Sequence, residues 1–320
     1  MRSKRILTFL MVTLLVFSLS ACNSKLALFI NAKTGDSYKC HIVVNQTTNM
    51  EYGDETGTST QNMVTDFIIA VDDVDSEGNL TMNYKYDALS IETEENGNKE
   101  TFDSKNADAD DPVSKLYNSI IGKGFLVKMT KFGEVKEISG IDEFLGSMLD
   151  SMGIDEDEST QALMEQMKAS LRESFGEDAL KSSIEQSTRV FPETENIKVG
   201  DSWTIENSFK SIVNLNMEAT YTLEKIEEKI AHISVKSDFE VDDGKSINYM
   251  GVEMLADLSG KMTGNIKVNI NNGLLSEGEL NQEVTGKMSL VMPAMDGGES
   301  QTIELPINIT SKATYTTTKM

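Results

Sequence analysis

The 320-residue sequence predicts an α+β fold. In this fold a duplicated antiparallel β-meander forms a large curved sheet or half-barrel, with an amphipathic helical segment inserted between the copies. Three observations lead to this prediction: strand-like alternation at both ends of the chain, helical periodicity in the middle, and similar motifs opening the two strand-rich parts. Because strands and helices are segregated along the chain, we expect α+β rather than alternating α/β.

The N-terminus is predicted to be a secretory signal peptide covering residues 1–21. A basic start (Arg2–Arg5) precedes an apolar run over residues 6–17, which is shorter than the roughly 20 residues that span a bilayer. Leu19-Ser20-Ala21-Cys22 then resembles the lipobox of bacterial lipoproteins, whose cysteine is diacylated and becomes the mature N-terminus. Two acyl chains give stable membrane anchoring. We therefore expect lipidation of Cys22 and attachment to the extracytoplasmic face of a bacterial cell membrane.

The mature chain is predicted to divide into a first β-rich half (22–140), a helical insertion (141–189) and a second β-rich half (190–320). We expect the two halves to form one compact unit. The first opens with Gly35-Asp36-Ser37-Tyr38 and the second with Gly200-Asp201-Ser202-Trp203. In each motif Gly-Asp favours a turn, and the aromatic residue begins the inward face of the next strand.

The alternation that follows each motif places Cys40 where the second copy has Ile205. This match favours a buried, small apolar side chain over a reactive thiol. Because Cys22 would be consumed by lipid, Cys40 is left without a partner for an intramolecular disulfide. Each copy also ends in a predicted hairpin, from Gly124 to Gly133 in the first and with the same spacing in the second.

The last hairpin is predicted around Asp296-Gly297-Gly298. Its second strand contains Pro306, which cannot donate a ladder hydrogen bond. We therefore expect this strand to lie at an edge of the sheet.

Helices are predicted over residues 113–121, 141–152 and 163–175, with a shorter one at 180–184, because apolar residues recur at intervals of three and four. One set of these apolar residues is expected to face the sheet and to be available to an apolar ligand. The set consists of Phe144, Met148, Met152, Met167 and Leu171.

The sequence offers little catalytic chemistry. The two histidines, His41 and His232, lie on the solvent side of their predicted strands, and neither has a nucleophile motif nearby. We find no phosphate-binding loop and no zinc-type Cys/His pair, so we expect no cofactor and no enzyme activity. A net charge of -23 argues against a nucleic acid partner.

One acidic turn is a weak candidate for calcium. Asp73, Asp75 and Glu77 have the spacing of the first half of an EF-hand loop. Tyr84 occupies the position of the bidentate glutamate, and strands rather than helices flank the turn. We therefore expect a solvated hairpin turn and no metal site.

Several segments together resemble a family of bacterial lipoproteins of unknown function. They are the lipobox, the helical middle, Gly133-Glu134-Val135, and Phe191-Pro192 followed by the Gly-Asp-Ser-Trp motif. The resemblance implies a fold and a location but no catalytic residues. At the level of architecture alone, a curved sheet under amphipathic helices is similar to lipoprotein carriers and mycobacterial lipid carriers, which hold acyl chains between sheet and helices.

These observations favour a non-catalytic, membrane-anchored extracytoplasmic lipoprotein with a structural or interaction role in the envelope. Its expected partners are the membrane, through the diacylglyceryl anchor, and a lipid or an envelope protein. The alternative is a carrier or binding protein for an apolar or amphipathic ligand held between sheet and helices. A second alternative is a hydrolase that uses carboxylates, since paired acidic residues are abundant.

Overall fold

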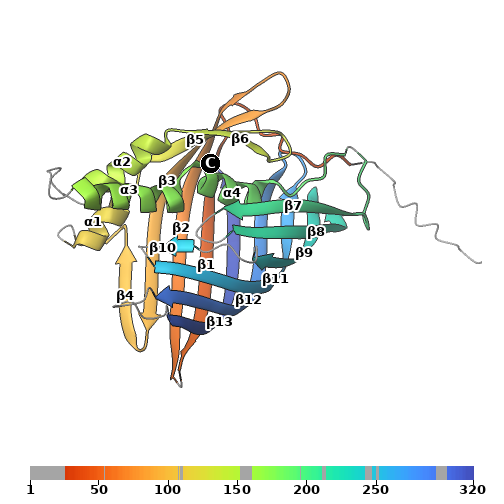
Figure 1. Ribbon diagram of the computed structural model, residues 1–320. Coiled ribbons are helices and arrows are strands. Elements are labelled where there is room, and N and C mark those ends of the chain that lie inside the picture. The colour runs from red at the N-terminus through yellow and green to blue at the C-terminus, as the bar shows by residue number, and fades with distance from the viewer. Residues whose placement is uncertain are drawn as a thin grey trace, which may run out of the picture.

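A computed structural model describes residues 26–53, 55–106, 108, 111–151, 161–194, 196–210, 214–241, 247–249, 252–292 and 301–320. Within these ranges, thirteen strands form one antiparallel sheet, and four helices lie on its inner side (Figure 1). The predicted α+β class is confirmed. The predicted signal peptide, Cys22, Met152 and the 296–298 turn lie outside the described residues.

The strands fall into two groups separated by the helices. The first group is β1 (Ser37–Tyr52), β2 (Glu55–Val74), β3 (Leu80–Glu95), β4 (Asn98–Asp103), β5 (Gly124–Met129) and β6 (Val135–Ser139). The second group is β7 (Ser202–Lys210), β8 (Asn214–Glu227), β9 (Ile230–Val241), β10 (Ile247–Tyr249), β11 (Val252–Asn269), β12 (Leu274–Met292) and β13 (Gln301–Lys319). The helices are α1 (Pro112–Asn118), α2 (Ile141–Ser151), α3 (Gln161–Phe175) and α4 (Glu177–Thr188).

The strand order is β6-β5-β3-β2-β1-β13-β12-β11-β9-β8-β7, with β4 paired to β3 and β10 paired to β11. The C-terminal strand β13 therefore joins the two groups by pairing with β1 on one side and β12 on the other. The expectation that the Pro306 strand is an edge is wrong. Pro306 pairs with Lys287 of β12 but lies beyond Met50, where the pairing with β1 ends, so the interior strand tolerates it.

The two Gly-Asp motifs form the same turn. Gly35 and Gly200 both adopt positive φ angles, 88° and 94°. The side chain of Asp36 accepts a hydrogen bond from the Lys33 amide at 3.1 Å, and that of Asp201 accepts the equivalent bond from the Lys198 amide at 2.9 Å. Each glycine amide also donates to a carbonyl on the second strand after it, that of Val71 on β2 at 2.8 Å and that of Leu223 on β8 at 2.7 Å. The matching bonds support the duplication inferred from sequence.

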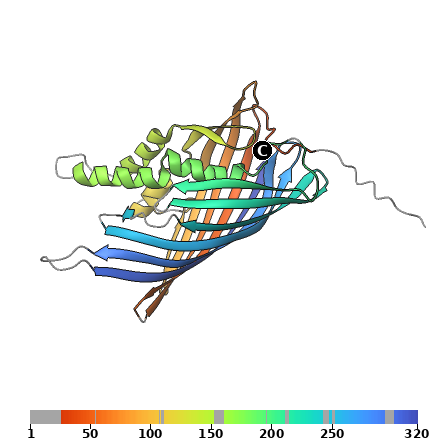
Figure 2. The ribbon, with the colours of Figure 1, turned by 45° about the vertical axis from the view of Figure 1, so that its right-hand side comes forward.

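The sheet curves until one helix bridges its two ends. Helix α4 packs against both terminal strands, β6 and β7 (Figure 2). The amide of Val135 donates to Glu185 Oε1 at 2.8 Å, whereas Arg189, just after α4, donates to the carbonyl of Glu206 at 3.2 Å. These contacts cover both edge strands of the path, which would otherwise expose unpaired backbone groups.

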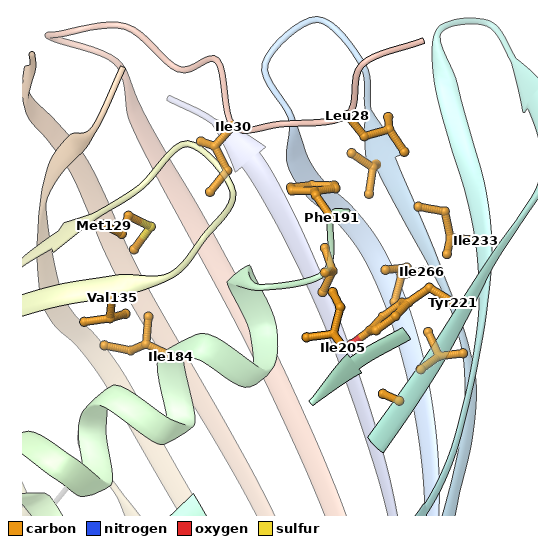
Figure 3. Packing of buried hydrophobic residues seen from close by; sticks show 14 of the residues in the cluster. Leu28, Ile30, Met129, Val135, Ile184, Phe191, Ile205, Tyr221, Ile233 and Ile266 are labelled. Carbon is orange, nitrogen blue, oxygen red and sulfur yellow. The ribbon is translucent and has the colours of Figure 1, made fainter. Parts of the chain in front are cut away.

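The apolar core has two parts. The main cluster lies between α4, the segment before β1, and inward side chains of both strand groups, including Leu28, Ile184 and Ile233 (Figure 3). The second cluster lies under α1, α2 and α3 and is built from Leu89, Phe102, Ile120, Phe144, Leu145 and Met148. Because the main cluster contains residues of both copies, the two halves share one core.

The helices follow the predicted periodicity. Helix α1 begins at Pro112 after the cap Asp111, whose side chain accepts a hydrogen bond from the Ser114 amide at 2.7 Å. Gly176 separates α3 from α4, where the sequence predicts the break. Both α2 and α4 carry two acidic residues in the first turn, which favours the helix dipole.

Candidate ligand-binding face

The two faces of the sheet differ sharply in charge. Directly paired residues lie on the same side of an antiparallel sheet, so the register assigns each residue to a face. On β1 the inner residues are Tyr38, Cys40, Ile42, Val44, Gln46, Thr48 and Met50. Among these seven, and the inner residues paired with them on β2, from Gly57 to Ile69, and on β13, from Ile307 to Lys319, only Lys319 is charged. The other charges within these ranges lie on the outer face.

Several inward apolar side chains remain half-buried. They belong to neither packed cluster, and we call them the inner strip: Ile42, Val44, Met50, Met288, Leu290, Ile303 and Ile309. Among the described residues, the helices contact mainly β5, β6 and β7 rather than these central strands. The β1–β2 hairpin projects beyond the helices (Figures 1 and 2). Covering apolar surface of this kind is favourable by about 25 cal/mol per Å².

Two inner tyrosines lie deep in the molecule and are still half-buried rather than buried. Burial raises the pKa of both Tyr84 and Tyr315 well above the usual range. Neither hydroxyl forms a hydrogen bond with another described residue, in contrast to Tyr38, whose hydroxyl donates to Asp36 at 3.0 Å. An unpaired hydroxyl in an apolar region is costly. These two groups are therefore available to a ligand or to water.

A row of uncharged polar side chains crosses the inner face. We call it the amide row, and its members in spatial order are Thr93, Gln61, Gln46, Ser311 and Gln282. Gln46 Nε2 donates to Thr48 at 3.3 Å. The side chains of Gln61, Ser311 and Gln282 form no hydrogen bond with another described residue. The row thus carries several free donors and acceptors but no charge.

Glycines on β11 and β12 let neighbouring side chains lie flat on the sheet. A Cβ on Gly278 would come within 2.1 Å of the Tyr315 ring, and one on Gly260 within 2.3 Å of the Phe239 ring. Glycine at such positions permits a tight bend and the close approach of a ring. The rings therefore cover backbone instead of standing up from the inner face.

The outer face has two hollows, both polar. One, of about 1120 Å³, is lined by a row that includes Glu218, Asp238, Lys261 and Glu283. The other, of about 500 Å³, lies over β1, β2, β12 and β13. Most of the residues that line them alternate onto the outer face, where hydrated carboxylates are ordinary, although Gln46, Gln61, Ser311 and Gln282 of the amide row also border the second hollow. The inner face is therefore the stronger candidate site.

Three of the predicted ligand-facing residues of the helices, Phe144, Met148 and Leu171, pack in or against the second cluster. Phe144 is 1% exposed and Met148 is 2% exposed. The Phe144 ring lies 5.7 Å from that of Tyr86 and 6.0 Å from that of Phe125. Leu171 is half-buried against the same cluster, and Met167 is half-buried. The helices and sheet thus meet here without leaving Phe144 or Met148 accessible.

The remaining candidates behave as follows. Cys40 is half-buried on the inner face, and burial raises the pKa of its thiol. His41 is exposed on the outer face, as predicted, and its Nδ1 lies 2.6 Å from the buried carboxylate of Asp66. His232 faces outward too, 3.8 Å from Glu227. No nucleophilic side chain is hydrogen-bonded to either histidine among the described residues.

The acidic turn is organised by its own hydrogen bonds. Asp75 accepts bonds from the amides of Glu77 and Asn79, both at 2.9 Å, and from the Asn79 side chain at 2.9 Å. Asp73 lies on β2 and pairs with Thr81. No group of three or more His, Cys, Asp or Glu within the described ranges is arranged to hold a metal ion.

The amide row was not identified from sequence. Each member is an isolated polar residue in its own strand, and four of the five are separated from the next by more than ten positions. Only the sheet register brings them into line. The available signal was the interruption of the apolar alternation by Gln46 between Val44 and Met50.

Comparison with known proteins places the chain in a family. Residues 77–275, more than half of the chain, match a family of unknown function, DUF6263. The chain belongs to this family. No curated protein matches it.

Solved structures resemble the chain only distantly. A structure titled for lipid–protein interactions in lipovitellin has a TM-score of 0.43 and 8% identity, over 89% of this chain and 25% of that one. The chain thus matches only a quarter of that protein's length. The COG4313 outer membrane channel from Pseudomonas putida F1 has a TM-score of 0.26 and 9% identity, over 91% and 98% of the two chains. Among the described residues, no helix has the length and apolar character needed to cross a membrane.

Proposed function

We propose that this member of DUF6263 is a membrane-anchored extracytoplasmic lipoprotein that binds an apolar or amphipathic ligand on the inner face of its sheet. The observation that carries the proposal is the inner strip, whose apolar side chains face inward, are only half-buried, and belong to neither packed cluster of the described residues. An apolar surface with a few placed polar groups is the usual composition of a ligand site. The two unpaired tyrosine hydroxyls supply such groups.

The binding test uses the uncharged dye Nile red and the Cys22→Ser chain. We expect saturable binding with blue-shifted emission. Ala313→Trp should weaken binding at least fivefold, because Ala313 lies on the inner face between Val44 and Leu280 and a large side chain would occupy the site. Thr316→Trp, on the exposed outer face of the same strand, is the matched control and should bind like wild type.

Mass spectrometry of an organic extract from membrane-derived protein completes the binding test. Co-purifying lipid supports a carrier. Absence of lipid, together with no dye binding, would contradict the proposal and favour a structural lipoprotein whose core is simply filled.

The anchor has a separate test. Cys22→Ser should abolish acylation, so the variant should leave the detergent phase in a partitioning experiment, whereas wild type should enter it. A Cys22→Ser protein that partitions like wild type would contradict the predicted lipidation.

A further inference from the structure

The polar content of the inner face restricts the ligand it can accept. Three of the amide-row members, Gln46, Gln61 and Gln282, carry carboxamides, each of which both donates and accepts hydrogen bonds. On one side of the row are the apolar Val44 and Leu280. On the other side, Ile309 and Val284 are apolar, whereas Thr48 and Ser59 in the same line carry hydroxyls. The row is therefore an uncharged polar band with apolar side chains on both sides of its β12 and β13 end.

An anionic group has no partner there. From Cys40 to Met50, the inner residues of β1 and those paired with them on β2 and β13 include no lysine, arginine or histidine. The inner partner of Tyr38 on β13 is a cation, Lys319, but it lies eight positions along the strand from Ser311 and is already paired with Asp36. Moving a carboxylate or phosphate out of water without a cation is strongly unfavourable, whereas a hydroxyl or ester needs only hydrogen bonds.

We infer that the ligand is a neutral amphiphile, an acyl ester with uncharged hydroxyl or sugar groups, whose polar part hydrogen-bonds to the amide row while its acyl chains cover the inner strip. This inference rests on the proposed binding function and names its substrate class. Free fatty acids and anionic phospholipids are excluded from tight binding at neutral pH by the same charge argument.

The band also suits a ligand with chains on both sides of its polar group. Ser311 lies four positions along the strand from the deep Tyr315, and four positions from Ile307 toward the other end of the strand. At about 3.3 Å per residue each interval is roughly 13 Å long, enough for a good part of an acyl chain. The unpaired hydroxyl of Tyr315 then lies at the inner end of one interval.

The experiment compares ligands of equal chain length and different charge. Dioleoylglycerol, monooleoylglycerol, oleate and dioleoyl phosphatidate compete with Nile red on the Cys22→Ser chain at pH 7.5. We expect the two glycerides to displace the dye with an apparent Kd at least tenfold lower than that of oleate or phosphatidate. Equal or tighter binding of the anions would overturn the neutral-ligand inference while leaving the binding function intact. Binding of neither class would overturn both.

Variants then test the amide row itself. Gln46→Leu combined with Gln282→Leu should weaken glyceride binding about three- to tenfold, since each lost hydrogen bond removes a modest net contribution. The matched controls are the outward amides next to them in sequence, Asn45→Leu combined with Asn281→Leu, which should bind like wild type. If the inner and outer pairs have equal effects, the row does not contact the ligand.

A charge-gain variant gives the opposite prediction. Gln282→Lys places a cation on the inner face and should raise oleate affinity relative to monooleoylglycerol by at least fivefold, with thermal unfolding measured to confirm the fold. An unchanged preference in a folded Gln282→Lys protein would overturn the assignment of the polar group to this row.

Discussion

At the scale of single residues, the inner face is defined more by what each side chain lacks than by a reactive group. Within the described residues, Gln61 and Gln282 have no side-chain partner, and the hydroxyls of Tyr84 and Tyr315 form no hydrogen bond. Gln61 is exposed and Gln282 half-buried, so water satisfies them until a guest replaces it. The deep tyrosine hydroxyls are the groups for which a guest would complete the hydrogen bonding, because buried polar groups are otherwise satisfied by the protein itself.

Cys40 reports on this face directly. In the Cys22→Ser chain it is the sole thiol, because the sequence has two cysteines. Burial raises the pKa of the Cys40 thiol, so less thiolate is present at pH 7.5 than in a free cysteine. We expect maleimide to label the native protein slowly and the denatured protein completely, with further slowing when monooleoylglycerol is bound. Native labelling as fast as that of denatured protein would contradict this.

At the scale of helices and strands, predictions that depend on local sequence succeeded, and one that depends on long-range strand pairing did not. The helices were predictable because their periodicity is local, and α3 and α4 meet at Gly176 as expected. The Gly-Asp turns were predictable for the same reason. The interior position of β13 in the sheet was not predictable. Pro306 shows only that one residue lacks a backbone N–H, whereas the partners of β13 are β1, near the N-terminus, and β12, near the C-terminus. Edge or interior position is a property of the pairing and is absent from the strand's own sequence.

Helices α1–α3 form a packed cover, which makes a definite prediction for Met148. This side chain is buried with Phe144 and Leu89 in the second cluster. Met148→Ala should lower the free energy of unfolding by about 2–5 kcal/mol, through lost transfer energy and a residual cavity. Its Nile red affinity should equal that of wild type, because the inner strip is elsewhere. Urea denaturation and dye titration measure both quantities.

Met167→Ala is the control for this prediction, since Met167 is only half-buried in α3. It should cost less stability than Met148→Ala. A small stability loss in Met148→Ala combined with altered dye binding would instead place the ligand under the helices, as the sequence alone suggested.

For the whole molecule, the central question is whether two repeated halves behave as one body. The strand order runs through the first copy in reverse, crosses β13, and continues through the second copy in reverse. Only β13 links the copies within the sheet. Outside it, α4 contacts both β6 and β7, and the main cluster draws buried residues from both copies. Shared packing of this extent favours a single cooperative unit.

The inner face is formed only when the two copies are joined in one sheet. The amide row takes Gln46 and Gln61 from the first copy, Gln282 from the second, and Ser311 from β13. Neither copy alone would contain the site. The pairing of β13, the last strand of the second group, with β1 therefore creates a continuous face that neither repeat has, which no single-strand pattern in the sequence could reveal.

Thr316→Pro tests this cooperativity. Thr316 is exposed on the outer face of β13, and its backbone lies between His41 of β1 and Glu277 of β12. Proline there removes a ladder hydrogen bond and should lower the free energy of unfolding by roughly 1–3 kcal/mol. Thr316→Ala, which keeps the backbone amide, should have a much smaller effect.

Trp203, the single tryptophan, reports on the second copy, whereas circular dichroism reports on both. Because the core is shared, the two signals should follow one urea transition in wild type and in Thr316→Pro, shifted together to lower urea. If the fluorescence transition separates from the dichroism transition in the proline variant, the halves fold independently and β13 alone holds them together.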